Sequence, residues 1–236
     1  MKTVIIDYKA GNVQSLLFAI ERLGFSAKLT NNFDEISKAD KVIFPGVGEA
    51  SFAMSSLKET ELDLLIPELK QPLLGICLGM QLLCRDSEES DTKALGIFDI
   101  SVKRFPDSVL VPQIGWNQIY DLKSDLFKNI PEQSYMYLVH SYYAEKNQNT
   151  IATTDYSESL HNNCIPRQIP KSGCLSAGIS KSNSVSRREF IAKEASPTPG
   201  KTTLSALEIS SKLLVSLAEN PNLSITNRRL WTFPAL

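Results

Sequence analysis

Short apolar runs separated by longer segments characterise the first third of the chain. The runs cover residues 3–7, 26–29, 41–44 and 73–76. Apolar runs of about five residues, bounded by turn-forming residues, are typical of buried strands. Because long segments separate the runs, we expect a parallel sheet, in which each connection crosses over one face of the sheet.

The segments between these runs have helical spacing. Asn12 is predicted to cap the first helix and Gly24 to end it. A further helix is predicted over residues 57–69. The apolar face of the first helix consists of Val13, Leu16, Leu17, Ile20 and Leu23. Strands that alternate with helices predict an α/β fold, a parallel sheet flanked by helices.

The pattern changes after residue 95. Residues 98–105, 118–122, 135–143 and 150–154 are predicted to be successive strands joined by turns. Residues 115–117 are expected to lie in one of the loops. An antiparallel extension of the parallel core is the expected arrangement.

A second change follows Tyr156, beyond which the sequence contains no tyrosine. Serine, proline and glycine become frequent there, as in segments that do not form a core. We therefore expect residues 1–156 to form an incomplete domain and residues 157–236 to form an aberrant, poorly ordered tail. A helix over residues 203–217 is the exception. The far edge of the parallel core is expected to lack strands.

The composition excludes several classes of protein. The chain has 236 residues, 22% of them charged, and a formal net charge of -1, so no nucleic-acid partner is expected. No apolar run has the length of a membrane span, and the first residues do not resemble a signal peptide. The four cysteines have no regular spacing, which favours reduced thiols and a cytoplasmic location.

The most informative motif surrounds Cys77. An apolar run leads into Gly75, Cys77 and Gly79, and helical spacing resumes at once. A strand, a sharp turn and a helix with the cysteine at the apex are typical of a nucleophile, because the helix N-terminus favours the thiolate. The alternative, a buried core cysteine, leaves the two glycines unexplained. Cys84, which is expected two helical turns further on, is predicted to be a packing residue.

Five segments together resemble a known family. They are 7–15 (Asp-Tyr-Lys-Ala-Gly-Asn-Val-Gln-Ser), 45–48 (Pro-Gly-Val-Gly), 75–81 (Gly-Ile-Cys-Leu-Gly-Met-Gln), 115–117 (Gly-Trp-Asn) and 139–143 (Val-His-Ser-Tyr-Tyr). Over about residues 1–156 the chain resembles the class I (triad) glutamine amidotransferases. Within that class it resembles the glutaminase subunit of imidazole glycerol phosphate synthase. The resemblance implies the flavodoxin-like sheet of that class.

The resemblance also implies an activity and a partner. Such subunits hydrolyse L-glutamine to glutamate and ammonia without a cofactor or a metal. The ammonia passes to a synthase (cyclase) subunit in a heterodimer. That subunit makes imidazole glycerol phosphate and aminoimidazole carboxamide ribotide in histidine biosynthesis.

The resemblance assigns roles to individual residues. Cys77 attacks the glutamine amide and forms a glutamyl thioester. The other assigned positions either bind substrate, stabilise the oxyanion or face the partner. Oxyanion donors come from Leu78 and the loop of Gly46, Val47 and Gly48; glutamine contacts come from Gln81, His140, Ser141 and Tyr142; Trp116 and Asn117 face the synthase. Ordinary strand packing is the alternative for His140, Ser141 and Tyr142, and a core position is the alternative for Trp116.

One part of the family pattern is missing. The family completes its triad near the C-terminus with His-Pro-Glu-Lys-Ser, in which the histidine is the base and the glutamate orients it. The sequence has no such motif, and Asn163 stands where an acid would follow His161. We therefore expect impaired glutaminase activity. The alternatives are a non-catalytic binding module of the same fold and another cysteine hydrolase with a similar turn.

Overall fold

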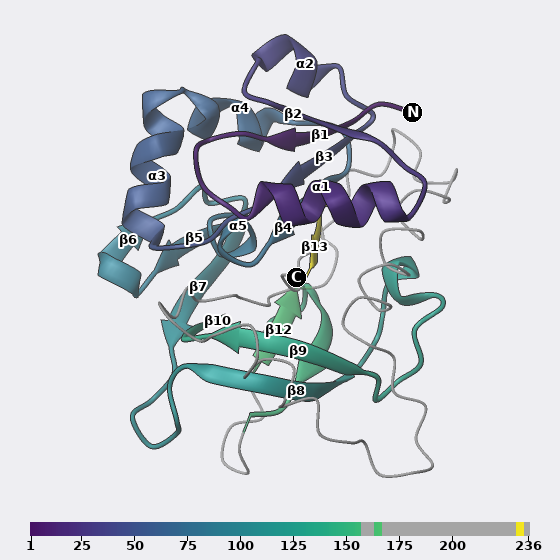
Figure 1. Cartoon of the computed structure of the whole chain (residues 1–236). Helices are drawn as coiled ribbons and strands as arrows, with labels where there is room; N and C mark the ends of the chain where they lie inside the picture. Colours follow the sequence, from purple (N-terminus) through teal and green to yellow (C-terminus); the bar gives the residue numbers. More distant parts are fainter. Residues whose placement is uncertain (157–162, 167–229, 234–236) are drawn as a thin grey trace, which may run out of the picture.

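A five-stranded parallel sheet forms the centre of the computed structural model, which describes residues 1–156, 163–166 and 230–233 (Figure 1). Its strand order is β13-β4-β3-β1-β2. The strands are β1 (Thr3–Ile6), β2 (Ala27–Thr30), β3 (Lys41–Phe44), β4 (Leu73–Ile76) and β13 (Leu230–Phe233). Four of these five strands were expected from the apolar runs, so the prediction of a parallel sheet is confirmed.

The register of this sheet brings three loops to one edge. Ile43 of β3 pairs with Ile5 of β1 and with Leu74 of β4, and all these pairings are parallel. The segments that follow β1, β3 and β4 therefore leave the sheet on the same side. The three strands are almost wholly buried, which holds their carboxyl ends at this edge.

The helices are short and join the strands. They are α1 (Val13–Arg22), α2 (Phe33–Ser37), α3 (Ala50–Glu59), α4 (Leu62–Glu68) and α5 (Leu78–Gln81). Figure 1 shows α1 across the front of the parallel strands, with α3 beside them. Within the described residues, none of the helices is long and apolar enough to cross a membrane.

The predicted first helix is confirmed, and its end has a specific geometry. Gly24 has a φ of 79° and donates to the carbonyl of Glu21, while Phe25 donates to that of Ile20. These two bonds form a Schellman motif, in which glycine takes the left-handed position without strain. Asn12 precedes the helix as expected, but its side chain makes no capping hydrogen bond.

The helix predicted over residues 57–69 is wrong as a single helix. The chain forms α3 and α4 instead, separated by Glu61 with a φ of 55°. The Thr60 hydroxyl donates to the carbonyls of Ser56 and Leu57, which occupies acceptors at the end of α3. The apolar spacing continues across the break because both helices pack on the core, so the pattern concealed the turn.

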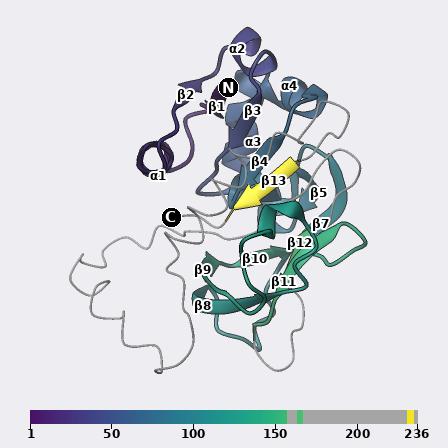
Figure 2. The ribbon, with the colours of Figure 1, turned by 90° about the vertical axis from the view of Figure 1, so that its right-hand side faces the viewer.

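Two four-stranded sheets extend the parallel core (Figure 2). Their orders are β10-β7-β5-β6 and β12-β11-β8-β9. The strands are β5 (Cys84–Ser87), β6 (Thr92–Lys93), β7 (Phe98–Arg104), β8 (Gln113–Tyr120), β9 (Tyr135–His140), β10 (Tyr142–Ala144), β11 (Thr150–Thr154) and β12 (Asn163–Pro166). Short 3-10 turns cover η1 (Glu89–Asp91) and η2 (Asp125–Phe127). Apart from the parallel β5–β7 pair, the pairings are antiparallel, which confirms the expected extension.

Two details of this extension differ from the prediction. The strand expected over residues 118–122 begins at Gln113 and ends at Tyr120. Residues 115–117 therefore lie inside β8 rather than in a loop, because Trp116 and its neighbours pair continuously with β9. The strand expected over residues 135–143 is interrupted at Ser141, which separates β9 from β10. Both differences result from pairing partners that are distant in sequence.

Two described segments beyond Tyr156 add one strand to the antiparallel extension and one to the parallel core. The backbone of β12 pairs with β11, and the backbone of β13 pairs with β4. The expectation that the far edge of the parallel sheet lacks strands is therefore wrong, since β13 lies beside β4. The helix predicted over residues 203–217 falls outside the described residues, and the boundary at Tyr156 stays a prediction.

Candidate active site

Cys77 lies at the apex of a strand-to-helix turn. The residue follows β4 directly, precedes α5, and has a φ of 56° and a ψ of -118°. Such a backbone is strained for a residue with a side chain and is typical of a nucleophile at the end of a parallel strand. The predicted strand, turn and helix are confirmed. The Cys77 side chain is 7% exposed.

The helix after the turn is shorter than the pattern suggested. It ends at Gln81, and Cys84 lies on β5 instead of two helical turns further on. Cys84 is nevertheless the packing residue that was expected, because it is completely buried. Burial raises the pKa of its thiol to about 12, so it carries almost no thiolate at neutral pH.

The glycines around the turn allow close approach between backbones. A Cβ on Gly79 would lie 2.1 Å from the carbonyl oxygen of Phe44, and one on Gly46 would lie 2.4 Å from the Gly79 nitrogen. The 45–48 loop after β3 therefore contacts the first turn of α5. Cys77 itself carries the strained backbone of the turn, and the backbone of Phe44 fills the space at Gly79.

Tyr8 supports the same loop, and sequence reasoning did not single it out. Its buried hydroxyl donates to the Pro45 carbonyl at 2.7 Å, and its ring packs on that of Phe44 with 5.3 Å between the ring centroids. Burial raises the pKa of Tyr8, and the nearby Cys77 adds to the shift. Tyr8 thus remains a neutral donor that holds the loop. Its place directly after the first strand was the available signal.

Gln81 connects the nucleophile turn to the antiparallel region. Its side-chain Nε2 donates to the carbonyl of Tyr142 at 3.3 Å. The Nδ1 of His140 lies 2.8 Å from the same carbonyl. A carbonyl oxygen only accepts, so both nitrogens are donors. The predicted glutamine contacts Gln81, His140 and Tyr142 therefore meet at one atom.

His140 is a buried, neutral histidine. Burial lowers its pKa to about 4, more than the bond to Tyr142 raises it. Since Nδ1 donates to the carbonyl, Nε2 is the unprotonated nitrogen, and it has no hydrogen-bond partner among the described residues. The structure thus places His140 behind the Ser141–Tyr142 segment.

Ser141 and Tyr142 are half-buried, and Tyr142 packs against the hydrophobic core, so the predicted contact with glutamine stays a prediction for both residues. Phe105 fixes the backbone here, because its N–H donates to the Ser141 carbonyl at 3.0 Å. Burial raises the pKa of Tyr142, and the negative charge of Glu89 adds to the shift. Glu89 therefore lies close enough to Tyr142 to influence its hydroxyl.

Glu89 is a second residue that sequence reasoning missed. Its carboxylate accepts from the Ala50 N–H at the start of α3, at 2.9 Å. Burial raises its pKa, and the Ala50 bond offsets part of the shift. The Ser90 hydroxyl donates to Glu49, so η1 is attached to the loop that follows Gly48. A run of acidic residues, Glu88 and Glu89 with Asp91, was the only signal in the sequence.

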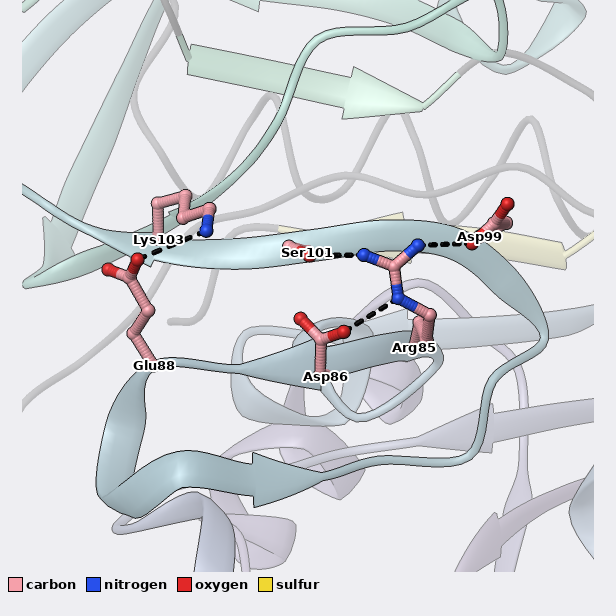
Figure 3. A network of polar contacts seen from close by, with 6 residues as sticks. All are labelled: Arg85, Asp86, Glu88, Asp99, Ser101 and Lys103. Carbon is pink, nitrogen blue, oxygen red and sulfur yellow. Dashed lines mark hydrogen bonds and ion pairs between the residues drawn. The ribbon is translucent and has the colours of Figure 1, made fainter.

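A polar network on β5 and β7 holds the segment before Glu89 (Figure 3). The Arg85 guanidinium binds Asp86, Asp99 and Ser101, joining the two strands. Glu88 binds Lys103 at 3.1 Å and accepts from the Arg104 N–H at 2.8 Å. These contacts hold the strand and turn that lead into Glu89.

The described residues thus bring a strained cysteine, a glycine-rich loop, Gln81, Tyr142 and Glu89 into one region. A search for related families gives a match to the model described as "Glutamine amidotransferase class-I" over residues 4–168, more than half of the chain. The chain is a member of the class I glutamine amidotransferase family. The match extends beyond Tyr156, where the motifs of the resemblance end.

Curated relatives of this amidotransferase agree with the family match. The subunit HisH of imidazole glycerol phosphate synthase from Bacteroides fragilis strain YCH46 is 51% identical over 168 residues, covering 68% of this chain and 86% of the relative. The subunit of the same name from Pasteurella multocida is 40% identical over 183 residues, covering 72% and 92%.

A solved structure shows the same fold. A Thermoplasma acidophilum protein, described as part of a GMP synthase, superposes with a TM-score of 0.54 at 14% identity. The superposition covers 92% of the amidotransferase and 94% of that protein.

Trp116 and Asn117 lie away from the nucleophile turn of the amidotransferase, on β8. The Trp116 side chain is 44% exposed and packs against Tyr137 of β9 at 5.5 Å, so it is not the core tryptophan of the alternative interpretation. Asn117 is structural at least in part, since it accepts from Gln113 and donates to the Asp155 carbonyl. Ile114, on the same face of β8, is also exposed.

The described part of the amidotransferase contains no cluster of side chains suited to a metal ion. His161, the remaining histidine of the sequence, lies outside the described residues. The general base of a triad therefore has no candidate in the described site other than His140, whose bond to Tyr142 and low pKa oppose that role.

Proposed function

We propose that this amidotransferase is the glutaminase subunit of an imidazole glycerol phosphate synthase. The curated relatives carry that subunit's name and are covered over most of their length. The strained turn at Cys77 is the observation that carries the chemistry. It presents a thiol at the carboxyl edge of the sheet, beside the Gly46 loop and Gln81.

In the proposed reaction, the Cys77 thiolate attacks the side-chain amide carbonyl of glutamine. The amide nitrogen takes up the proton that the thiol gave up, the carbon–nitrogen bond breaks, and ammonia leaves a glutamyl thioester. Water then hydrolyses the thioester, which releases glutamate and the Cys77 thiol. Leu78 is the first residue of α5, so its N–H has no intrahelical acceptor and suits the oxyanion. The second donor comes from the loop of Gly46, Val47 and Gly48, where a φ of 100° at Gly48 permits a backbone unsuited to other residues.

Polar groups on both walls suit the rest of glutamine. Gln81, Ser141 and Tyr142 are proposed to contact the amino-acid end of the substrate. Glu89 adds a half-buried negative charge near Tyr142, which favours the α-ammonium group over a second carboxylate. His140 acts through Tyr142 and does not touch the substrate.

The chain as it stands is proposed to have very low turnover. Its sequence contains no His-x-Glu motif. Removing one member of a cooperating triad costs about three to six orders of magnitude in rate. A glutamate-release assay should therefore give a rate near background for this chain. A version that carries His-Pro-Glu-Lys-Ser in place of the aberrant tail segment should recover at least about a thousandfold.

The Cys77→Ala variant of the restored chain is the control and should return to background. High activity of the unaltered chain that is lost in His161→Ala would contradict the proposal, since the tail would then supply the base.

The proposed partner is the synthase (cyclase) subunit, a lyase that receives the ammonia. The two subunits are proposed to form a heterodimer in the cytoplasm. Trp116, with Asn117 beside it, is proposed to face that partner, because an exposed tryptophan is a frequent interface anchor. Trp116→Ala should weaken the complex by about 2 kcal/mol in a calorimetric titration. Unchanged affinity would remove Trp116 from the interface.

A non-catalytic binding module is the second candidate, and the missing His-x-Glu motif favours it. Such a module would bind the synthase and glutamine with the same described residues. Absence of recovery in the restored chain, together with retained partner binding, would select this candidate.

A further inference from the structure

Two side chains from different elements of the described site share the Tyr142 carbonyl as their acceptor. The His140 Nδ1 is 2.8 Å away and the Gln81 Nε2 is 3.3 Å away. Gln81 belongs to the turn that carries the nucleophile, whereas His140 belongs to β9. One carbonyl therefore connects the two walls of the proposed glutamine site.

The backbone needs this support at Ser141. The strand is interrupted there, and Tyr142 pairs with β7 rather than continuing along β8. The Phe105 N–H holds the Ser141 carbonyl at 3.0 Å, and the Phe105 ring packs against the edge of His140 at 5.1 Å. The next peptide, that of Tyr142, has its carbonyl held by His140 and Gln81.

The bond also determines the orientation of the Gln81 amide. Because Nε2 points at a carbonyl, Oε1 is the atom that faces away from Tyr142 and is available to accept from a ligand. Without the Tyr142 carbonyl in place, the terminal amide could rotate and present either atom.

We infer that His140 is a positioning residue for glutamine binding, which holds the Tyr142 carbonyl and thereby fixes the Gln81 amide. It is neither the general base nor a direct ligand of the substrate. The inference rests on the proposed function, because it concerns the same glutamine site.

The neutral state of the ring supports this role. Burial keeps the pKa of His140 at about 4, so Nδ1 donates one hydrogen bond throughout the neutral range. Among the described residues, the aromatic ring of Phe105 and the carbonyl of Tyr142 contact the His140 ring, and neither titrates.

The test uses the full chain and a chloromethyl ketone analogue of glutamine. The Cys77 sulfur displaces chloride from this probe, forming a carbon–sulfur bond, and the thiol proton passes to solvent. Its labelling rate saturates with probe concentration only if a glutamine site exists. Iodoacetamide labelling of Cys77 measures the thiol alone. The readout does not require the missing triad base.

His140→Leu should raise the half-saturating probe concentration about tenfold, the effect of one lost hydrogen bond on an affinity. Iodoacetamide labelling of Cys77 should stay within about twofold. His140→Asn, which places an amide donor near the Nδ1 position, should stay within about threefold of the unaltered chain. The ratio of the labelling rate with the chloromethyl ketone to the labelling rate with iodoacetamide should not change between pH 6 and 8.

Met136→Ala is the matched control, because it removes a buried side chain from the same strand without altering the Tyr142 carbonyl. It should lower stability but leave the half-saturating concentration unchanged. Gln81→Leu should raise that concentration, and adding His140→Leu should change it less than about twofold further, since both act through one carbonyl.

The outcomes separate the two claims. Labelling of the unaltered chain that does not saturate would refute the glutamine site itself. If labelling saturates but His140→Leu leaves the half-saturating probe concentration unchanged, only the positioning role is refuted. Additive effects of the His140 and Gln81 substitutions on that concentration would refute it as well. If His140→Leu does not fold, His140→Asn is compared with His140→Gln, whose donor lies near Nε2. Equal values for those two would also overturn the inference.

Discussion

The two walls of the site are built by different physical means. On the parallel-sheet wall, backbone packs directly on backbone, because Gly46 and Gly79 have no side chains to separate the loop from α5. On the antiparallel wall, side chains from distant elements hold a single carbonyl at Tyr142. The first wall is therefore intolerant of added atoms, and the second is sensitive to lost hydrogen bonds.

This comparison predicts a large penalty at Gly79. In Gly79→Ala the new Cβ would lie 2.1 Å from the Phe44 carbonyl oxygen, which is backbone and has little freedom to move. We expect the free energy of unfolding to fall by at least about 3 kcal/mol in urea titrations. Gly24→Ala is the control, since its Cβ would meet nothing within 4 Å and only the φ of 79° opposes it. That variant should lose about 1 kcal/mol, and equal losses would contradict the packing argument.

The same difference explains what could be predicted from the sequence. Four of the five parallel strands, the turn at Cys77 and the helix ending at Gly24 follow from local apolar periodicity and glycine positions. The break at Glu61, the interruption at Ser141 and the strand through Trp116 depend on pairing with remote segments, which periodicity does not contain. Tyr8 and Glu89 were missed for a related reason, since their roles exist only once Pro45 and Ala50 lie beside them.

The antiparallel wall should respond to acid through His140. Its folded pKa is about 4, below the usual value of 6.5, so the unfolded chain binds more protons between these two values. Stability therefore falls as pH decreases through that window. The free energy of unfolding should drop by about 2 kcal/mol between pH 7 and pH 5 from this residue alone.

His140→Asn removes the titrating ring and keeps a donor, so it isolates this contribution. The difference in unfolding free energy between the unaltered chain and His140→Asn should shrink or change sign as pH falls to 5. A difference that is constant with pH would contradict a buried neutral His140.

The two described buried thiols allow a smaller test of the parallel wall. Cys77 sits on the strained turn, whereas Cys84 is fully buried on β5 with a pKa raised to about 12. Brief iodoacetamide treatment followed by peptide mapping should label Cys77 at least about tenfold faster than Cys84. Cys164 and Cys174 are quantified separately by the same mapping. Equal labelling of Cys77 and Cys84 would remove the special reactivity assigned to the turn.

The smallest expected change concerns Trp116, on the outer face of the antiparallel wall. Its side chain is 44% exposed and its main contact is the Tyr137 ring, so Trp116→Ala should lower the free energy of unfolding by less than about 1 kcal/mol. Met136 lies on the paired strand β9 and is only 2% exposed. Met136→Ala should therefore lower the free energy of unfolding by at least about 2 kcal/mol. Equal losses at the two positions would mean that Trp116 is a packing residue. If only Met136→Ala lowers the free energy of unfolding, Trp116 is not needed for stability. Weakened binding of Trp116→Ala to the synthase could then not result from unfolding, which would support a place for Trp116 in the interface.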